Sequence, residues 1–356
     1  MERKFISHDD ITAWLDGLAR DHVDLVPMKD GGSVSFRPYV QGRTPNLDRQ
    51  AVPSPKDAVF PQNETLLKYR FEKDPEHLDR TRIQVKETLP TEKTVVVGAR
   101  PCGTRGMLTF DRVYDCDKNQ DLYYRTRKEN TLHVTVACTR VESTCFCHDV
   151  GSGPADGEGS DVLLVPVASG YVAEPITERG EALLAASQFK AAGDREAEAE
   201  AVKAATVAKL PEAHDYSDSA EKLMARFDDM EFWEEQSAKC ISCGACTYLC
   251  PTCYCFNITD DTTGLTGRRL RSWDNCMSFQ FTLEGSGHNP RPTKAHRLKN
   301  RVGHKFAYYP MLHANAIACC GCGRCIKSCP AGVDIRAIVK AAQNYTPKKE
   351  EGGDES

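Results

Sequence analysis

Two cysteine runs with the same spacing constrain this chain more than any other feature. The first, CISCGACTYLCP, begins at Cys240, and the second, CCGCGRCIKSCP, begins at Cys319. Both follow the pattern Cys-x2-Cys-x2-Cys-x3-Cys-Pro, which bacterial proteins use to hold two 4Fe–4S clusters. Zinc sites need four ligands each and give no reason for a repeated Cys-Pro step. The sequence therefore predicts two 4Fe–4S clusters.

In this pattern three close cysteines hold one cluster, and the fourth reaches across to the other cluster. The predicted ligands of the first cluster are Cys240, Cys243, Cys246 and Cys329, and those of the second are Cys319, Cys322, Cys325 and Cys250. Glycines within the runs fit a backbone that turns tightly and points its N–H groups at sulfur. They are Gly244, Gly321 and Gly323.

The bulk composition is that of an ordinary soluble protein of about two domains. The chain has 356 residues, 17 cysteines and a net charge of −5, so its overall field gives no argument for nucleic acid. Its start, MERKFISHDDITAW, lacks the apolar region of a signal peptide, and no run of 18 apolar residues suggests a membrane span. Cluster-type cysteines without an export signal predict a cytoplasmic protein of an anaerobe.

The first half reads as an α/β domain over residues 1–175. Apolar runs predict strands at 94–99, 132–137 and 162–167, and a helical pattern covers 105–114 between the first two. This strand–helix–strand order predicts parallel strands with a right-handed crossover. An amphipathic segment from Ile11 to Leu18 precedes them.

The second half is predicted to be mainly helical. Residues 176–237 read as a helical linker, rich in Ala and Glu up to Lys209 and continuing in a helix from Asp215 to Ser237. Residues 238–342 form a ferredoxin-like domain with two clusters and a long insertion between the cysteine runs. The polar tail, 343–356, is predicted to be disordered.

Four upstream cysteines suggest a third site. Cys102 follows the first clear strand and Cys138 the second, so both thiols are expected at the carboxyl edge of the sheet. Cys145 and Cys147 follow on the next loop. Four thiols at one edge suit a third 4Fe–4S cluster, with zinc or inert buried thiols as the alternatives.

The remaining cysteines are assigned to packing or left open. Cys319 keeps the two-residue gap to Cys322, so it is preferred over Cys320 as the ligand, and Cys116 is interpreted as ordinary packing. Three others either pack beside a cluster or provide an alternative set of ligands. These are Cys253, Cys255 and Cys276.

A basic segment, HNPRPTKAHRLKNRVGHKFAYY at 288–309, contains no acidic residue and follows three nearby arginines, Arg268, Arg269 and Arg271. Cations near a cluster with four thiolates would raise its reduction potential and ease its burial. Docking of an acidic partner is a second use, and a solvated charged loop is the plain alternative. Nucleic acid is disfavoured because two ferredoxin-type clusters serve electron transfer.

No motif of a catalytic site is found elsewhere in the chain. GARPCGTRG has glycines without the dinucleotide spacing or a Walker lysine, and neither HExxH nor GxSxG occurs. We therefore predict no catalytic residue and expect the chain to transfer electrons only. A flavin- or substrate-binding protein with its own active site in the N-terminal domain is the alternative.

Several blocks together resemble one family. CISCGACTYLCPTCYCF, RSWDNCMSFQFT, GHNPRP, HKFAYY and CCGCGRCIKSCP, with VVVGARPCGTRGMLTFDRVY and LHVTVACTRVESTCFCHDVG upstream, are similar to the iron–sulfur β-type subunits of cytoplasmic sulfhydrogenases and to the corresponding iron–sulfur subunit of anaerobic sulfite reductase. This resemblance implies an electron relay between a flavin subunit that handles NAD(P)H and a catalytic subunit. That second partner would be a hydrogenase, a sulfite reductase or a heterodisulfide-reductase-like protein.

Overall fold

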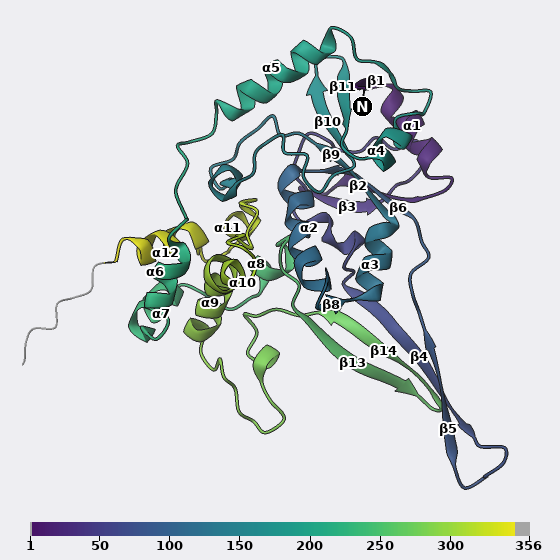
Figure 1. Cartoon of the computed structure of the whole chain (residues 1–356), viewed down its shortest axis with the longest axis vertical. Coiled ribbons are helices and arrows are strands. Elements are labelled where there is room, and N and C mark those ends of the chain that lie inside the picture. Colours follow the sequence, from purple (N-terminus) through teal and green to yellow (C-terminus); the bar gives the residue numbers. More distant parts are fainter. Residues whose placement is uncertain (1, 346–356) are drawn as a thin grey trace, which may run out of the picture.

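A mixed eight-stranded sheet organises the first half of the chain in the computed structural model, which describes residues 2–345 (Figure 1). Its strands are, in spatial order, β12 (Lys190–Ala191), β1 (Lys4–Ser7), β11 (Gly170–Pro175), β10 (Val162–Val167), β9 (Thr131–Val136), β6 (Thr94–Ala99), β2 (Val23–Asp30) and β3 (Ser33–Pro38). The central strands β10, β9, β6 and β2 are parallel, and the outer ones pair antiparallel. The α/β fold and the parallel pairing expected of β6 and β9 are confirmed.

Apolar residues cover both faces of this sheet, because successive strand residues point to opposite sides. In β6, Val95 and Val97 join one buried cluster with Trp14, whereas Val96 joins another with Ala58. The helices of this half are α1 (Asp10–Leu18), α2 (Pro101–Tyr114), α3 (Leu122–Glu129), α4 (Glu178–Leu183) and α5 (Arg195–Val207). Short elements complete it: η1 (Pro55–Ala58), β7 (Asp115–Cys116), β8 (Asn119–Gln120) and η2 (Cys147–Val150).

Two predicted helices have different bounds in the structure. The helix expected at 105–114 begins at Pro101, whose fixed φ and missing N–H suit the first helical position. The helix expected from Asp215 to Ser237 is two helices, α6 (Ser219–Ala225) and α7 (Met230–Ser237). The start of the predicted linker also belongs to the sheet, since β12 pairs with β1 and α5 packs on β10.

A second sheet joins distant parts of the chain. Its strands are, in order, β13 (Phe256–Thr263), β14 (Thr266–Trp273), β4 (Asn63–Lys73) and β5 (Thr81–Glu87). The first two come from the insertion between the cysteine runs, and the last two come from the N-terminal half. At its base the buried Arg271 of β14 forms ion pairs with Glu64 of β4 and with Asp121. This sheet contains strands from before residue 175 and from after residue 238, so it crosses both predicted domain boundaries. The boundaries themselves stay predictions.

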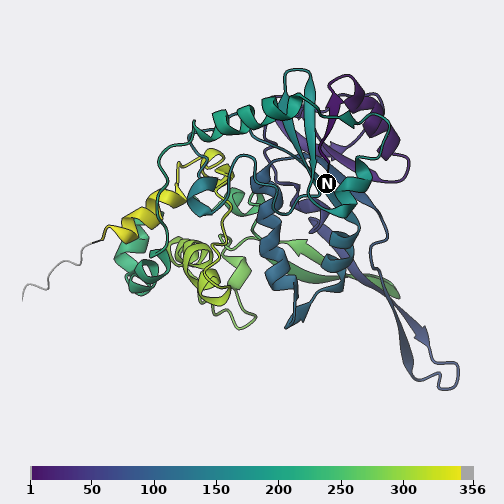
Figure 2. The ribbon, with the colours of Figure 1, turned by 45° about the horizontal axis from the view of Figure 1, so that its top comes forward.

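The rest of the second half consists of short helices around the cysteine runs, drawn in green and yellow beside the sheet (Figure 2). They are α8 (Ala245–Tyr248), η3 (Gln280–Thr282), α9 (Lys294–Gly303), η4 (His304–Tyr308), α10 (Tyr309–Leu312), α11 (Arg324–Lys327) and α12 (Ile335–Gln343). Phe306, Trp233 and Val339 are central in their shared core. Of the predicted disordered tail, Gln343 ends α12, and residues 346–356 lie outside the described residues. Between residues 2 and 345, the structure contains no helix long and apolar enough to cross a membrane.

Candidate iron–sulfur sites

Each cysteine run folds into a tight loop followed by a single helical turn, α8 in the first run and α11 in the second. Gly244 and Gly323 precede these turns with φ of 76° and 70°, in the left-handed region that favours glycine. A Cβ at Gly323 would lie 2.4 Å from the carbonyl oxygen of Thr144, so a side chain does not fit there. The tight turns expected of these glycines are therefore present, and α8 and α11 pack against each other.

The four thiols predicted for the first cluster line one cavity. Cys240, Cys243 and Cys246 contribute from the first run, and Cys329 contributes from the end of the second. Backbone N–H groups point at two of these sulfurs: Ser242 N lies 3.4 Å from Cys240 Sγ, and Val333 N lies 3.3 Å from Cys329 Sγ. Such N–H donors are typical around cluster thiolates.

The thiols predicted for the second cluster also lie together. Burial, together with the charge of the neighbouring Cys250, raises the pKa of Cys319 to about 12. Burial likewise raises the pKa of Cys325, with Cys319, Cys322 and Cys250 as like-charged neighbours. Cys250 of the first run thus has thiols of the second run as charge neighbours, while Cys329 lines the cavity of the first set, which Cys325 lines as well. Protonated thiols at these positions would have to release their protons to bind iron.

The structure brings the four upstream cysteines together at the carboxyl edge of β6 and β9. Cys102 lies in the first turn of α2, and its charge neighbours include Cys138 and Cys147. Burial raises the pKa of Cys147 to about 12, with Cys138 and Cys145 adding to the effect. Gln50 Nε2 donates a hydrogen bond of 3.3 Å to Cys102 Sγ.

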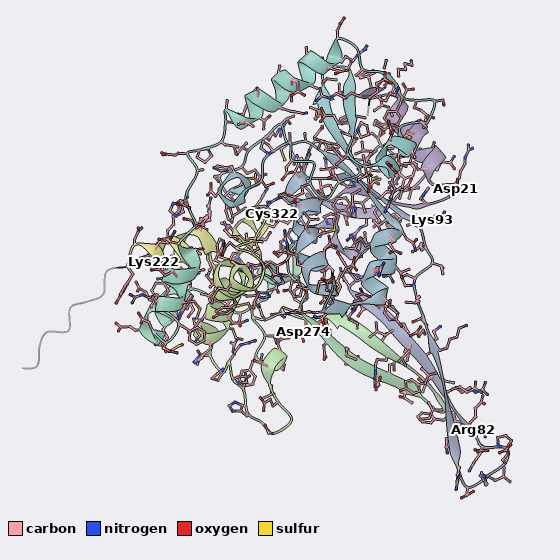
Figure 3. All side chains as sticks on the ribbon, viewed as in Figure 1. Asp21, Arg82, Lys93, Lys222, Asp274 and Cys322 are labelled. Atoms are coloured by element: carbon pink, nitrogen blue, oxygen red, sulfur yellow. The ribbon has the colours of Figure 1, made fainter. Side chains whose placement is uncertain are left out.

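This upstream group continues into the second cysteine run. Cys102 shares a small buried cluster with Cys320 and Cys322, close to the centre of the molecule where Figure 3 labels Cys322. Sequence reasoning did not foresee the place of Cys320, because a residue outside the spacing pattern carries no local signal. Within residues 2–345 no three His, Cys, Asp or Glu side chains are arranged to hold a single metal ion. A 4Fe–4S cluster needs a different arrangement, because each of its four thiolates binds a different iron atom and the sulfurs need not converge on one point.

The cysteines outside the predicted ligand sets lie either next to the cluster thiols or in the strand β7. Cys253 hydrogen-bonds Cys250 and lowers the pKa of that thiol well below its usual value, and Cys255 forms a similar pair with Cys276. Cys253 therefore lies beside Cys250 of the second set, whereas Cys276 is a charge neighbour of Cys246 of the first set. These positions fit either a packing role or a role as ligands. Cys116 lies in the short strand β7 and not in the preceding helix.

Buried cations surround these thiols. Within residues 2–345 seven lysine or arginine side chains are buried, and of these seven only Arg271 forms ion pairs with carboxylates. The other six are Lys56, Arg100, Arg297, Arg301, Lys305 and Arg324. All but Arg297 have cysteines as charge neighbours.

The contacts of these cations are direct. Lys305 Nζ lies 3.6 Å from Cys250 Sγ, Arg301 Nη1 lies 3.6 Å from Cys253 Sγ, and Arg324 Nη1 lies 3.9 Å from Cys102 Sγ. An unpaired buried cation costs several kcal/mol, so these groups need a buried anion. Clusters held by four thiolates are anionic, and they fit the residues present.

Arg301 and Lys305 come from the basic segment and project inward from one long helical stretch. That stretch runs from α9 through the π-helical turn η4, which contains Lys305. Interruptions of this kind are frequent at functional sites. The three preceding arginines have other roles: Arg268 and Arg269 pair with Asp261 and Asp260, and Arg271 holds the base of the second sheet.

A polar cavity of about 310 Å³ opens beside the second cluster site. Its lining includes Arg105, Arg112, Asp149, Tyr216 and Cys319. The Tyr216 hydroxyl is buried without a hydrogen-bond partner in the described part of the chain, and Asp149 Oδ1 lies 2.9 Å from His148 Nε2.

Comparisons with known proteins agree with this geometry. The family model described as "4Fe-4S dicluster domain" matches residues 239–333. Sulfhydrogenase 2 subunit beta of Pyrococcus furiosus is 30% identical over 256 residues, which cover 70% of this chain and 74% of that protein. No solved structure matches the chain at a significant level.

Proposed function

The chain belongs to the family of iron–sulfur β subunits that includes this sulfhydrogenase subunit, and from this premise we propose that it relays electrons within an oxidoreductase complex. Its partners would be a flavin subunit that oxidises or reduces NAD(P)H and a catalytic subunit. The catalytic subunit would be a hydrogenase, a sulfite reductase or a heterodisulfide-reductase-like protein. This chain would itself perform no bond chemistry on a substrate.

We propose the crossed ligand sets for the two ferredoxin-type clusters. Cys240, Cys243, Cys246 and Cys329 hold the first, and Cys319, Cys322, Cys325 and Cys250 hold the second. Each bound cluster supplies a one-electron carrier. The chain's own residues hold the cluster, donate N–H groups to its sulfurs and keep water away from it.

The single observation that carries this proposal is the set of buried cations that have no carboxylate partner among residues 2–345. Arg301, Lys305 and Arg324 all direct their charge at cysteine sulfurs. Neutral thiols would leave these charges uncompensated, whereas anionic clusters compensate them. The same cations would raise the reduction potentials of the clusters, because they favour the more negative reduced state.

A relay predicts rapid electron exchange with a flavin partner. In an anaerobic complex purified with its natural subunits, NAD(P)H should bleach the broad visible absorbance of the clusters. The isolated chain should show that absorbance without flavin peaks, and NAD(P)H alone should leave it unchanged. If the isolated chain retains a flavin, or reacts with NAD(P)H by itself, the chain has its own active site and the relay proposal fails.

We further propose a third 4Fe–4S cluster at Cys102, Cys138, Cys145 and Cys147. Their grouping at one sheet edge and the nearby buried Arg100 and Arg324 support it. Three clusters require about twelve iron atoms per chain, and two require about eight. Anaerobically purified protein should therefore contain about twelve iron atoms and about as many labile sulfides.

A Cys138→Ala variant tests the third site separately. It should lose about four iron atoms, since each cluster contains four, and keep the other two clusters. Cys116→Ala, which alters a half-buried thiol outside all three sites, should lose none. About eight iron atoms in the parent protein, or zinc removed together with Cys138, would contradict the third cluster.

The alternative function, a protein with its own ligand site, has one specific observation in its favour. The 310 Å³ cavity beside Cys319 is within the size range of small-molecule pockets and contains the unpartnered Tyr216 hydroxyl. The spectral test above separates the two functions, because a bound flavin would be visible in the isolated chain.

A further inference from the structure

The second sheet projects from the body of the molecule as an arm, which we define as β4, β5, β13 and β14 (Figures 1 and 2). Every residue of β5 and of β13 is exposed. One face of the arm carries Tyr69 and Phe71 in edge-to-face contact, next to Ile83 and Val85, which are 58% and 60% exposed. A sheet with so little cover offers a large surface to another molecule.

The opposite face of the arm carries a row of three cations. The pairing register places Arg268 directly across from Lys68, and Lys68 directly across from Lys86. Like charges directly opposite each other in an antiparallel sheet are destabilising. Arg268 pairs with Asp261, whereas Lys68 and Lys86 form no ion pair within residues 2–345. The isolated chain therefore has a repulsive row that a bound anion would relieve.

The row lies in a concave groove of about 570 Å³. The charged residues that line it are Lys68, Arg70, Lys86, Arg268 and Asp261. Arg70 pairs with Glu72 and Arg268 pairs with Asp261, so Lys68 and Lys86 give the groove its excess positive charge, although the whole chain has a net charge of −5. Complementary potentials of this kind select partners and speed their association.

We propose that this groove binds an acidic segment of a partner subunit in the oxidoreductase complex. This inference rests on the proposed function, because it assigns a docking role to the arm of a relay subunit. The groove is remote from the clusters: Figure 3 labels Arg82 on the arm, well separated from Cys322. Contacts at the arm hold the partner, and electron transfer takes place elsewhere.

Carbodiimide cross-linking of the intact complex tests the contact directly, since the reagent joins lysine amines to carboxylates in contact. Mass spectrometry should find Lys68 or Lys86 joined to an Asp or Glu of a partner subunit. Links from these lysines only to this chain's own carboxylates, or none at all, would overturn the proposal.

Charge-reversal variants test whether the positive groove contributes to assembly of the complex. The K68E/K86E variant should weaken the purified complex at least tenfold and reduce the salt dependence of its dissociation, while its iron content stays that of the parent. The matched control, K29E/K190E, reverses two exposed lysines that form no ion pair in the described residues, and it should bind normally. Equal binding by both variants would overturn the proposal.

Two further outcomes are informative. Tight binding of the parent protein, but not of K68E/K86E, to a 20-nucleotide duplex would assign the groove to nucleic acid and overturn the acidic-segment proposal. If the parent complex forms but transfers no electrons from NAD(P)H, the proposed function fails. If it transfers electrons and K68E/K86E assembles as well as the parent, only the docking inference fails.

Discussion

A Cys250→Ala variant is expected to lose about four iron atoms per chain, the content of one cubane. The lost cluster should be the one held by the second run, because Cys250 lies among Cys319, Cys322 and Cys325. Iron and labile sulfide analysis under anaerobic conditions measures the loss. Cys116→Ala serves as the control that should retain every cluster.

Double variants decide which cysteines share a cluster. Cys250→Ala combined with Cys322→Ala should lose no more iron than either single variant, because both changes remove the same cluster. Cys250→Ala combined with Cys243→Ala should lose about eight iron atoms, because the changes then affect two clusters. The reverse result would mean that each run holds its own cluster. If Cys250→Ala keeps its iron and Cys253→Ala loses it, Cys253 is the ligand.

Replacing the buried Lys305 by methionine is expected to lower the reduction potential of the second cluster by roughly 100 mV. A unit charge a few ångströms away, at an effective dielectric constant of about 20, is worth about 2–4 kcal/mol, and about 1.4 kcal/mol corresponds to 59 mV for one electron. The sign follows from charge, because Lys305 Nζ stabilises the reduced and more negative cluster. An anaerobic redox titration followed by electron paramagnetic resonance measures the change.

Two control variants separate charge from packing. Lys305→Arg keeps the charge and should stay near the parent potential. Lys327→Met removes an exposed lysine that pairs with Glu142 and should change the potential little, because water screens that charge. An unchanged potential in Lys305→Met, with the cluster still bound, would show that Lys305 does not compensate the cluster's charge.

The strands of the first sheet were predictable because their signal is local. Runs such as 94–99 are almost wholly apolar, which is typical of strands buried on both faces. The spacing of the cysteine runs is equally local, and it predicts the exchange of Cys250 and Cys329 that we propose. The upstream group was predictable through topology, because parallel strands end at the same edge of a sheet.

The arm was not predictable, because it depends on pairing between strands far apart in the sequence. Nothing near Asn63 or Thr266 indicates that β4 will pair with β14. Of the buried cations, some were visible in the sequence as part of a basic segment and others were not. Arg301 and Lys305 stand four residues apart in a visibly basic helix, whereas Lys56 and Arg324 reach the thiols only through the tertiary fold.

The proposed exchange of Cys250 and Cys329 between the two runs has a consequence for how the protein is made. A nascent chain that has just emerged beyond the first run has three of the thiols of one set and one thiol of the other. The second proposed set is complete only at Cys325 and the first only at Cys329, both close to the C-terminus. With these ligand sets, both ferredoxin-type clusters are completed late, on a chain whose N-terminal sheet has already had time to form.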